Sequence, residues 1–89
     1  MILVVDDDEA VLRIMSRMLT GSGYQCATVR SAAEARQALR DASWDLVLSD
    51  MVMPAESGID LLRHVRAEYE RLPIVIDQLQ RDQSQRQKN

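Results

Sequence analysis

Aliphatic runs and amphipathic stretches alternate along this chain. Residues 2–5, 46–49 and 74–76 are almost entirely apolar, which is typical of strands buried on both faces of a parallel sheet. A weaker run over 24–29 predicts one further strand. Between these runs, apolar residues recur every three or four positions, which indicates helices with one buried face. The predicted order is strand, helix, strand, helix, strand, helix, strand.

Local signals predict where the three helices begin and end. Asp8 is expected to cap the first helix, which the glycines at 21 and 23 bring to an end. Ser31 and Ser57 each stand three residues before an acid, the spacing of a capping box, and are expected to open the second and third helices. The third helix should end before Pro73. The residues predicted to face the core are Val11, Leu12, Met15, Met18 and Leu19 in the first helix, Ala35, Ala38 and Leu39 in the second, and Ile59, Leu62, Val65 and Tyr69 in the third.

This alternation predicts an α/β fold, a doubly wound parallel sheet with helices on both faces. Residues 77–89 differ in character, because Leu79 is their only apolar residue. The small apolar surface of this segment cannot offset the conformational entropy lost on ordering. We therefore expect a polar tail that is disordered or a frayed helix. The predicted division is a domain over residues 1–76 and a tail over 77–89.

Length and composition narrow the class of protein. A chain of 89 residues allows one small domain. The net charge is −3 and no basic patch stands out, so we expect no direct contact with nucleic acid. Cys26 is the only cysteine, which excludes an intrachain disulfide and fits a reducing compartment. Since no apolar run approaches the roughly 20 residues that span a bilayer, we expect no membrane contact and a cytoplasmic location.

Acids stand where two of the predicted strands end. Asp6 and Asp7 follow the first strand and Asp50 follows the strand at 46–49. If these strands are neighbours, about 4.8 Å apart, the three carboxylates converge at the edge where open α/β sheets bind ligands. Their mutual repulsion would favour a divalent cation, and an all-oxygen set without Cys or His favours Mg²⁺. We interpret Asp50 as a phosphoryl acceptor beside this Mg²⁺; the alternative is that the acids are only helix caps.

Several segments together resemble the receiver domain of two-component response regulators. Residues 2–9 (ILVVDDDE) are similar to the opening of that domain. Residues 45–54 (DLVLSDMVMP), followed by Gly58, are similar to its phosphorylation-site segment. The likeness continues through residues 59–62 and 72–76, and it covers residues 1–76.

The resemblance implies a fold and a role for each site residue. The family fold is flavodoxin-like (CheY-like), with strand order 2-1-3-4-5, of which this chain would form 2-1-3-4. Asp50 would take a phosphoryl group from a histidine kinase or a phosphotransfer protein. Asp7 and Asp50 would bind Mg²⁺ directly, Asp6 would act through water, and the backbone carbonyl of Val52 would be a further ligand.

The chain departs from the family pattern after residue 76. The family has a Ser or Thr at the end of its fourth strand and a Lys at the end of its fifth. Asp77 and Gln78 stand in the region of the Ser or Thr, and the only lysine of this sequence is Lys88. The resemblance therefore predicts a receiver truncated after the fourth strand, with impaired switching. It also predicts an exposed strand edge and a bare face on the first helix, and hence a homodimer, a domain swap or a poorly folded monomer.

Two alternative functions stay open. The chain could be a protein-interaction module that works without phosphorylation, through the edge of the fourth strand and the face of the first helix. The run Asp6-Asp7-Asp8 also fits the first motif of haloacid-dehalogenase phosphatases. However, Ala10 stands where that motif has Thr or Val, and the chain is too short for the rest of that fold.

Overall fold

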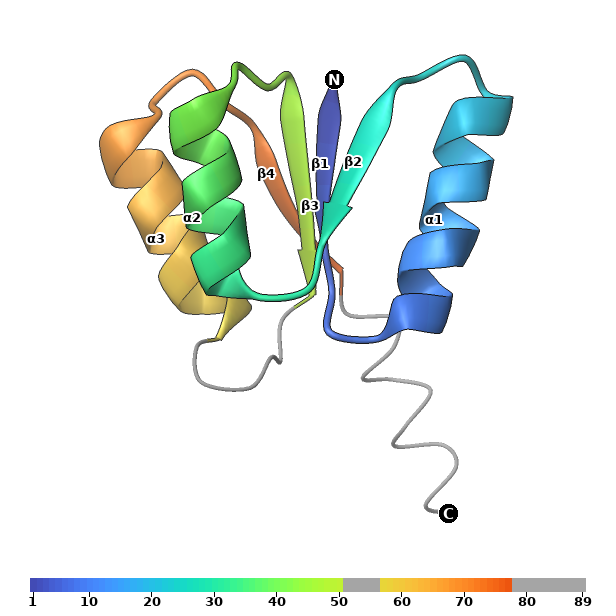
Figure 1. Ribbon diagram of the computed structural model, residues 1–89. Helices are drawn as coiled ribbons and strands as arrows, with labels where there is room; N and C mark the ends of the chain where they lie inside the picture. The colour runs from blue at the N-terminus through green and yellow to red at the C-terminus, as the bar shows by residue number, and fades with distance from the viewer. Residues whose placement is uncertain (51–56, 78–89) are drawn as a thin grey trace.

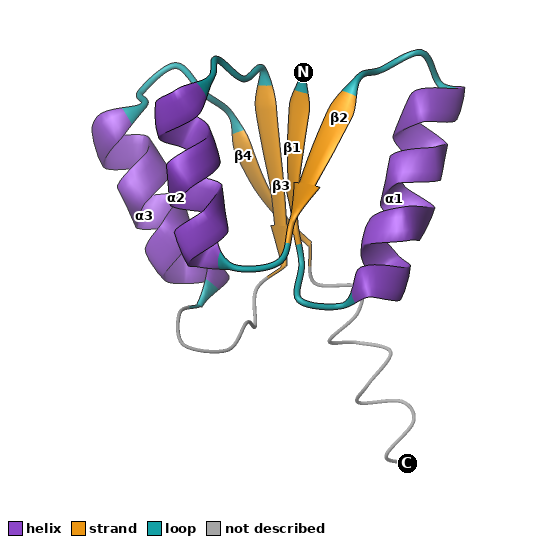
Figure 2. Ribbon diagram, in the orientation of Figure 1, coloured by secondary structure: helices purple, strands orange, loops and turns teal. Residues whose placement is uncertain are grey.

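The computed structural model describes residues 1–50 and 57–77, which form a parallel sheet with helices on both faces (Figures 1 and 2). Its strands and helices alternate throughout, as the hydrophobic pattern predicts. In chain order they are β1 (Ile2–Val5), α1 (Glu9–Gly21), β2 (Cys26–Val29), α2 (Ala32–Asp41), β3 (Leu46–Asp50), α3 (Gly58–Glu68) and β4 (Ile74–Asp77).

The strand order is β2-β1-β3-β4, and every neighbouring pair is parallel. This order confirms the predicted fold class. The register places Val5 opposite Ser49, so that the ends of β1 and β3 lie side by side. Acids that follow these two strands therefore meet at the carboxyl edge of the sheet.

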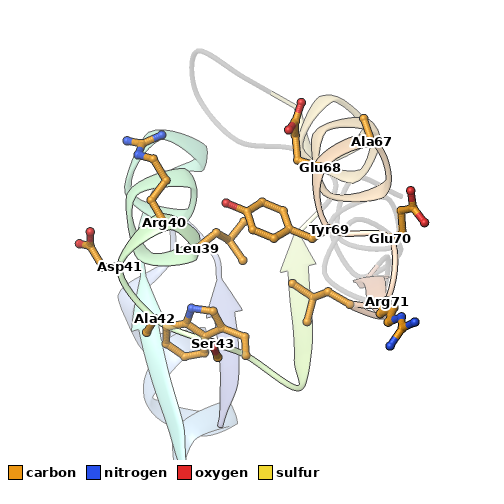
Figure 3. Close-up of a pocket in the computed structure, with 12 residues that line it drawn as sticks. Leu39, Arg40, Asp41, Ala42, Ser43, Ala67, Glu68, Tyr69, Glu70 and Arg71 are labelled. Carbon is orange, nitrogen blue, oxygen red and sulfur yellow. The ribbon is translucent and has the colours of Figure 1, made fainter.

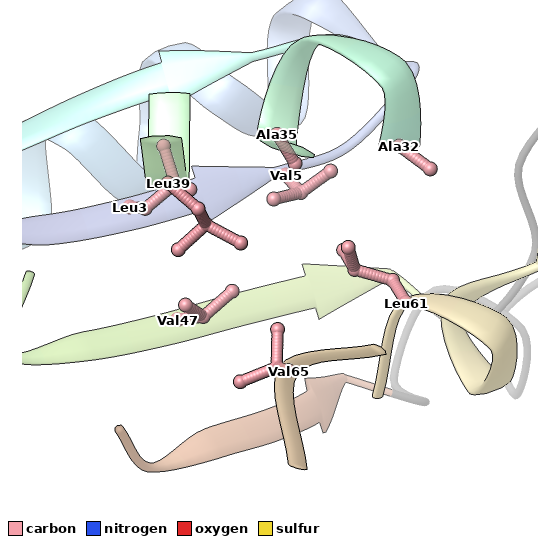
Figure 4. Close-up of a cluster of buried hydrophobic side chains, with 8 residues drawn as sticks. All are labelled: Leu3, Val5, Ala32, Ala35, Leu39, Val47, Leu61 and Val65. Atoms are coloured by element: carbon pink, nitrogen blue, oxygen red, sulfur yellow. The ribbon is translucent and has the colours of Figure 1, made fainter. Parts of the chain in front are cut away.

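The larger part of the core lies between the sheet and the pair α2 and α3 (Figure 4). Every second residue of a strand points to this side, and the helices add side chains four residues apart, which is one helical turn. Such a continuous apolar layer fixes the register, because a slip of one residue would turn this set of side chains to the other face. The buried members are Leu3, Val5, Ala32, Ala35, Leu39, Val47, Leu61 and Val65.

A smaller cluster lies between α1 and the opposite face of the sheet. Ile2, Val4 and Leu12 are its buried members, and Met15, Leu19, Cys26, Leu46 and Leu48 pack against them. On this face α1 lies over β1 and β2 (Figure 1).

Each predicted cap is confirmed. The Asp8 carboxylate accepts a hydrogen bond from the Ala10 amide at 2.9 Å and a longer one from the Val11 amide. The Ser31 hydroxyl accepts from the Glu34 amide at 3.1 Å, and Ser57 does the same for Asp60 at 3.2 Å. Side chains thereby satisfy amides that the first turn of each helix leaves unpaired.

Two predicted helix faces are wrong in detail. In α3 the fully buried residues are Leu61 and Val65, whereas Ile59 and Leu62 are only half-buried. Apolar residues at 59, 61 and 62 are compatible with two rotations of the helix, and packing against the sheet selects the one with Leu61 inside. In α1, Met18 is 64% exposed although its spacing puts it near the apolar face, because no described element packs against that flank.

The ends of β2 and β4 also differ from the predicted ranges. β2 begins at Cys26, two residues later than expected. β4 continues through Asp77, one residue past the predicted domain boundary at 76/77, since its backbone pairs with Asp50. The predicted tail beyond that point lies outside the described residues. Among the helices that the structure describes, none has the length and apolar character to cross a bilayer.

Candidate metal and phosphoacceptor site

Three carboxylates meet at the carboxyl edge of the sheet, at the ends of β1 and β3. Asp6, Asp7 and Asp50 each offer an oxygen, and these oxygens lie within 4.8 Å of one another. Asp6 is 4% exposed, Asp50 is 7% exposed and Asp7 is half-buried. The structure thus brings together the three side chains that the sequence singles out.

Backbone contacts hold Asp6 in place. Its amide donates to the carbonyl of Val29 at 3.2 Å, which continues the pairing of β1 with β2 by one residue. Its carboxylate accepts a hydrogen bond from the Asp8 amide at 2.9 Å. Asp8 in turn caps α1, so the segment that turns from β1 into α1 is fixed at both of these acids. The sequence predicts the cap, but not that the Asp8 amide also donates to Asp6.

The environment of Asp6 disfavours its charge. The pKa of its carboxyl is raised from 3.8 to about 6, chiefly by burial and in part by the neighbouring charges of Asp50 and Asp7. The hydrogen bond from the Asp8 amide opposes this change, since it stabilises the carboxylate. The cluster therefore carries unfavourable negative charge near neutral pH, which a bound cation would relieve.

Asp50 is the last residue of β3 and is held by the sheet. The preceding Ser49 is 1% exposed, and its hydroxyl donates to the carbonyl of Asp50 at 3.0 Å. Because Asp50 belongs to the paired part of the strand, its backbone is fixed before any loop begins. Val52, predicted to offer its carbonyl to the metal, lies outside the described residues.

Asp77 occupies the register position opposite Asp50, at the end of β4. From the sequence, Asp77 begins the polar tail and stands where the resemblance expects a Ser or Thr. What the structure adds is its partner: since Val47 pairs with Ile74, position 77 falls beside position 50. An aspartate therefore pairs with the phosphoacceptor candidate in the register of β3 and β4.

The donor set fits a hard divalent cation. It consists of carboxylate oxygens, and neither a His nor a Cys belongs to this group within the described part of the chain. Mg²⁺ favours such ligands, and commonly takes one or two carboxylates while keeping waters that a phosphate oxygen can replace. Asp7 is half-buried, which leaves the group open to solvent on one side.

A hollow lies between the C-terminal ends of α2 and α3, at the end of the sheet opposite to the three acids (Figure 3). Its volume is about 810 Å³. In Figure 3 the Tyr69 ring reaches across it toward Leu39. Trp44 also lines it, but the indole N–H of Trp44 already donates to the Ala38 carbonyl at 2.9 Å. Since none of the three clustered acids lines this hollow, it is separate from the candidate site.

Comparisons with known proteins agree with this geometry. Residues 2–89 match the family described as the response regulator receiver domain. The chain is 37% identical over 73 residues to the DNA-binding transcriptional regulator NtrC of Escherichia coli K12. It is 39% identical over 75 residues to the DNA-binding response regulator MtrA of Mycolicibacterium smegmatis. These alignments cover 82% and 84% of this chain, but only 16% of NtrC and 32% of MtrA.

Solved receiver structures have the same architecture. The response regulator protein TrrA of Thermotoga maritima, solved in complex with Mg²⁺-BeF, matches with a TM-score of 0.82 at 29% identity. That match covers 84% of this chain and 65% of TrrA. TrrA has also been solved in complex with the histidine kinase ThkA, and there it matches with a TM-score of 0.81. From its sequence and its fold alike, this chain belongs to the response regulator receiver domain family.

Proposed function

We propose that this chain is the phosphoacceptor module of a two-component response regulator, with Asp50 as the acceptor and a histidine kinase as the donor. The observation that carries the proposal is the cluster of Asp6, Asp7 and Asp50, with carboxylate oxygens within 4.8 Å of one another at the carboxyl edge of the sheet. Family membership supports signalling rather than enzymatic turnover. The solved complex of TrrA with ThkA supports a kinase as the partner.

In this proposal an oxygen of the Asp50 carboxylate attacks the phosphorus of the donor. A new oxygen–phosphorus bond forms, while the bond from phosphorus to the donor's histidine nitrogen breaks and its electron pair returns to that nitrogen. β3 fixes the backbone of Asp50. Holding the nucleophile in line with the donor lowers the barrier to phosphoryl transfer. A small acyl phosphate would serve as donor in the same way, with an oxygen leaving instead.

Asp6 and Asp7 would hold the cation beside Asp50. A bound Mg²⁺ supplies positive charge that offsets the charge of the transferring group. We assign direct ligation to Asp7 and Asp50 and contact through water to Asp6, with the Val52 carbonyl as a further ligand. The Mg²⁺-BeF complex of the similar protein TrrA supports a cation at the corresponding place.

Switching in this chain would be impaired. The family's hydroxyl residue at the end of the fourth strand is replaced by Asp77, which stands opposite Asp50 in the register. Aspartate carries no hydroxyl, so this register position lacks the hydrogen-bond donor that the family has there.

The test is phosphoryl labelling of the purified chain with a small acyl phosphate and Mg²⁺. We expect label on the wild type, none on Asp50→Asn, and unchanged label on Asp41→Asn, which alters an exposed acid at the other edge of the sheet. Label that persists in Asp50→Asn would reject Asp50 as the acceptor. Loss of label on adding a chelator would confirm the need for a divalent cation.

The exposure of Val75 and Met18 favours a second candidate, an interaction module that works without phosphorylation. Under that function the wild type would take no label under any condition, and phosphodonor would not change its assembly. The labelling experiment therefore separates the two candidates.

A further inference from the structure

Two helices of the same face end at the hollow shown in Figure 3, which we call the α2–α3 hollow. α2 ends at Asp41 and α3 at Glu68, and both residues line it, together with the turns that lead into β3 and β4. All of its lining residues belong to the described ranges. Its volume of about 810 Å³ falls within the roughly 300–1,000 Å³ that is usual for small-molecule sites.

The floor of the α2–α3 hollow is aromatic and aliphatic. The Tyr69 ring reaches toward Leu39, and Trp44 and Leu72 line the hollow from the turns that follow the two helices (Figure 3). Trp44 and Tyr69 are half-buried, so each ring keeps part of its surface accessible. The hydrogen bond from the Trp44 indole N–H to the Ala38 carbonyl, at 2.9 Å, holds this ring in place. The hollow therefore offers apolar contact and an aromatic ring of fixed orientation.

The backbone atoms that the two helix ends offer are hydrogen-bond acceptors. The last carbonyls of a helix lack a partner within it and point toward its C-terminal end. Among the described residues, Ala38 in α2 and Val65 in α3 have the last carbonyls that accept a backbone N–H. The carbonyls that follow, at 39–41 and 66–68, accept none from this part of the chain. A ligand that fills the hollow must therefore bring hydrogen-bond donors.

The charge around the α2–α3 hollow is negative on balance. Each helix C-terminus carries about half a negative charge. The arginines do not offset this inside the hollow, because Arg40 donates to the Gln37 side chain at 2.7 Å and Arg71 points outward in Figure 3. An anion would meet both helix ends unfavourably, whereas a cation is favoured there. The charged lining residues are Asp41, Glu68, Glu70, Arg40 and Arg71.

We propose that the α2–α3 hollow binds a small organic cation, an ammonium or guanidinium group on a short alkyl chain. Such a group carries N–H donors and no acceptor, which matches the carbonyls of the helix ends. Its charge is stabilised by the two helix C-termini and by the rings of Trp44 and Tyr69. Its alkyl chain packs on Leu39 and Leu72. Since the hollow lies at the end of the sheet opposite to the acidic cluster, this binding does not depend on the phosphoacceptor function.

The first test uses the fluorescence of Trp44, which is the only tryptophan of the sequence and so reports on the α2–α3 hollow alone. The chain is titrated with n-butylguanidinium, with n-butylammonium and, as the control of opposite charge, with n-butyrate at equal ionic strength. We expect a saturable change with both cations, with dissociation constants on the order of 1 mM, and at least tenfold weaker binding of butyrate.

Two results of this titration would overturn the proposal. The first is a response to the cations that rises linearly, as it does for free N-acetyltryptophanamide, because a linear response shows collisions rather than a site. The second is butyrate binding as tightly as the cations, which would show that the hollow does not select positive charge.

The second test removes one ring from the site. Tyr69→Leu keeps an apolar side chain but loses the ring, and should weaken n-butylguanidinium binding at least fivefold. Tyr24→Leu is the matched control, because Tyr24 is the other tyrosine of the sequence, is 57% exposed and does not line the hollow. Circular dichroism checks that both variants fold. Equal affinities in the wild type and the two variants would contradict the assigned site.

The third test locates the ligand on the wild type, so it holds even if Tyr69→Leu does not fold. In a ¹⁵N-labelled chain, n-butylguanidinium should shift the indole N–H of Trp44 and the amides of residues 39–44 and 67–72. The amides of Asp6, Asp7 and Asp50 should stay in place, since they lie at the opposite end of the sheet. Shifts confined to those three acids would overturn the proposal, because the cation would then bind at the acidic cluster.

Discussion

Asp50 and Asp77 occupy opposite positions in the parallel register of β3 and β4, at the edge of the sheet where Asp6 and Asp7 also lie. We expect replacement of Asp77 to raise the rate at which Asp50 takes label from a small acyl phosphate with Mg²⁺. Asp77→Asn removes the charge, and Asp77→Ser removes the charge and supplies a hydroxyl. Because position 77 pairs with position 50 in the register, we expect removal of its charge to accelerate uptake roughly threefold to tenfold.

The control for this comparison is Asp41→Asn, which removes a charge at the far edge of the sheet. If Asp77→Asn and Asp77→Ser both label at the wild-type rate, the aspartate at this position is not what limits uptake. A rate that rises only in Asp77→Ser would assign the effect to the hydroxyl rather than to the charge.

The raised pKa of Asp6 predicts how stability depends on pH without metal. Its pKa is about 6 in the folded chain and near 3.8 when unfolded, so the folded state binds this proton more tightly. The free energy of unfolding should therefore fall as the pH rises from about 4 to above 6, by roughly 1–3 kcal/mol from this group. Urea denaturation with a chelator at pH 5 and pH 7.5 measures the change.

Asp6→Asn should remove most of this pH dependence and should be the more stable variant at pH 7.5 without metal. It should also weaken Mg²⁺ binding, because one acid of the cluster is gone. Asp41→Asn should behave like the wild type in both respects. An Asp6→Asn chain with the same pH dependence as the wild type would show that another group is responsible.

Leu61 and Leu62 give a direct test of how α3 is rotated. Leu61 is fully buried in the core between the sheet and the pair α2 and α3, whereas Leu62 is half-buried. We expect Leu61→Ala to lower the free energy of unfolding by about 2–5 kcal/mol, and Leu62→Ala to lower it by about half as much or less. Thermal and urea denaturation of the two variants would show the difference, and equal losses would contradict this rotation.

The cap of α1 should be worth a measurable part of the stability. Asp8→Ala removes the acceptor for the Ala10 and Val11 amides and should lower the free energy of unfolding by about 1 kcal/mol. Asp8→Ser should restore most of it, because a serine hydroxyl can also accept from these amides. An alanine variant as stable as the wild type would mean that solvent replaces the cap without loss.

Much of the fold and of the site follows from local features of the sequence. The aliphatic runs 2–5 and 46–49 identify strands buried on both sides, and parallel pairing of those strands brings Asp6 and Asp50 together. The caps at Asp8, Ser31 and Ser57 follow from side-chain chemistry within one helical turn. The strands and caps depend on residues close in sequence, and the meeting of Asp6 with Asp50 follows once two such strands are taken as neighbours, which is why these features can be predicted.

The features that escaped prediction depend on contacts between distant residues. Spacing alone cannot choose between Leu61 and Leu62, since both belong to helical patterns, and only the sheet beneath decides. Met18 fits the apolar face of α1 by spacing, yet it is exposed because no described element packs beside it. The resemblance identifies Asp77 as the residue in place of a Ser or Thr, but its pairing with Asp50 comes only from the register of β3 and β4.

The acidic cluster joins two parts of the chain that are far apart in sequence, at residue 6 and residue 50. A cation therefore has no preformed place to bind until β1 and β3 have paired, which carries the entropic cost of closing the long stretch of chain between them. Mg²⁺ would consequently favour the fully assembled sheet over any partly folded form. Its uptake would thus report, on the timescale of folding, the moment at which the central strands come together.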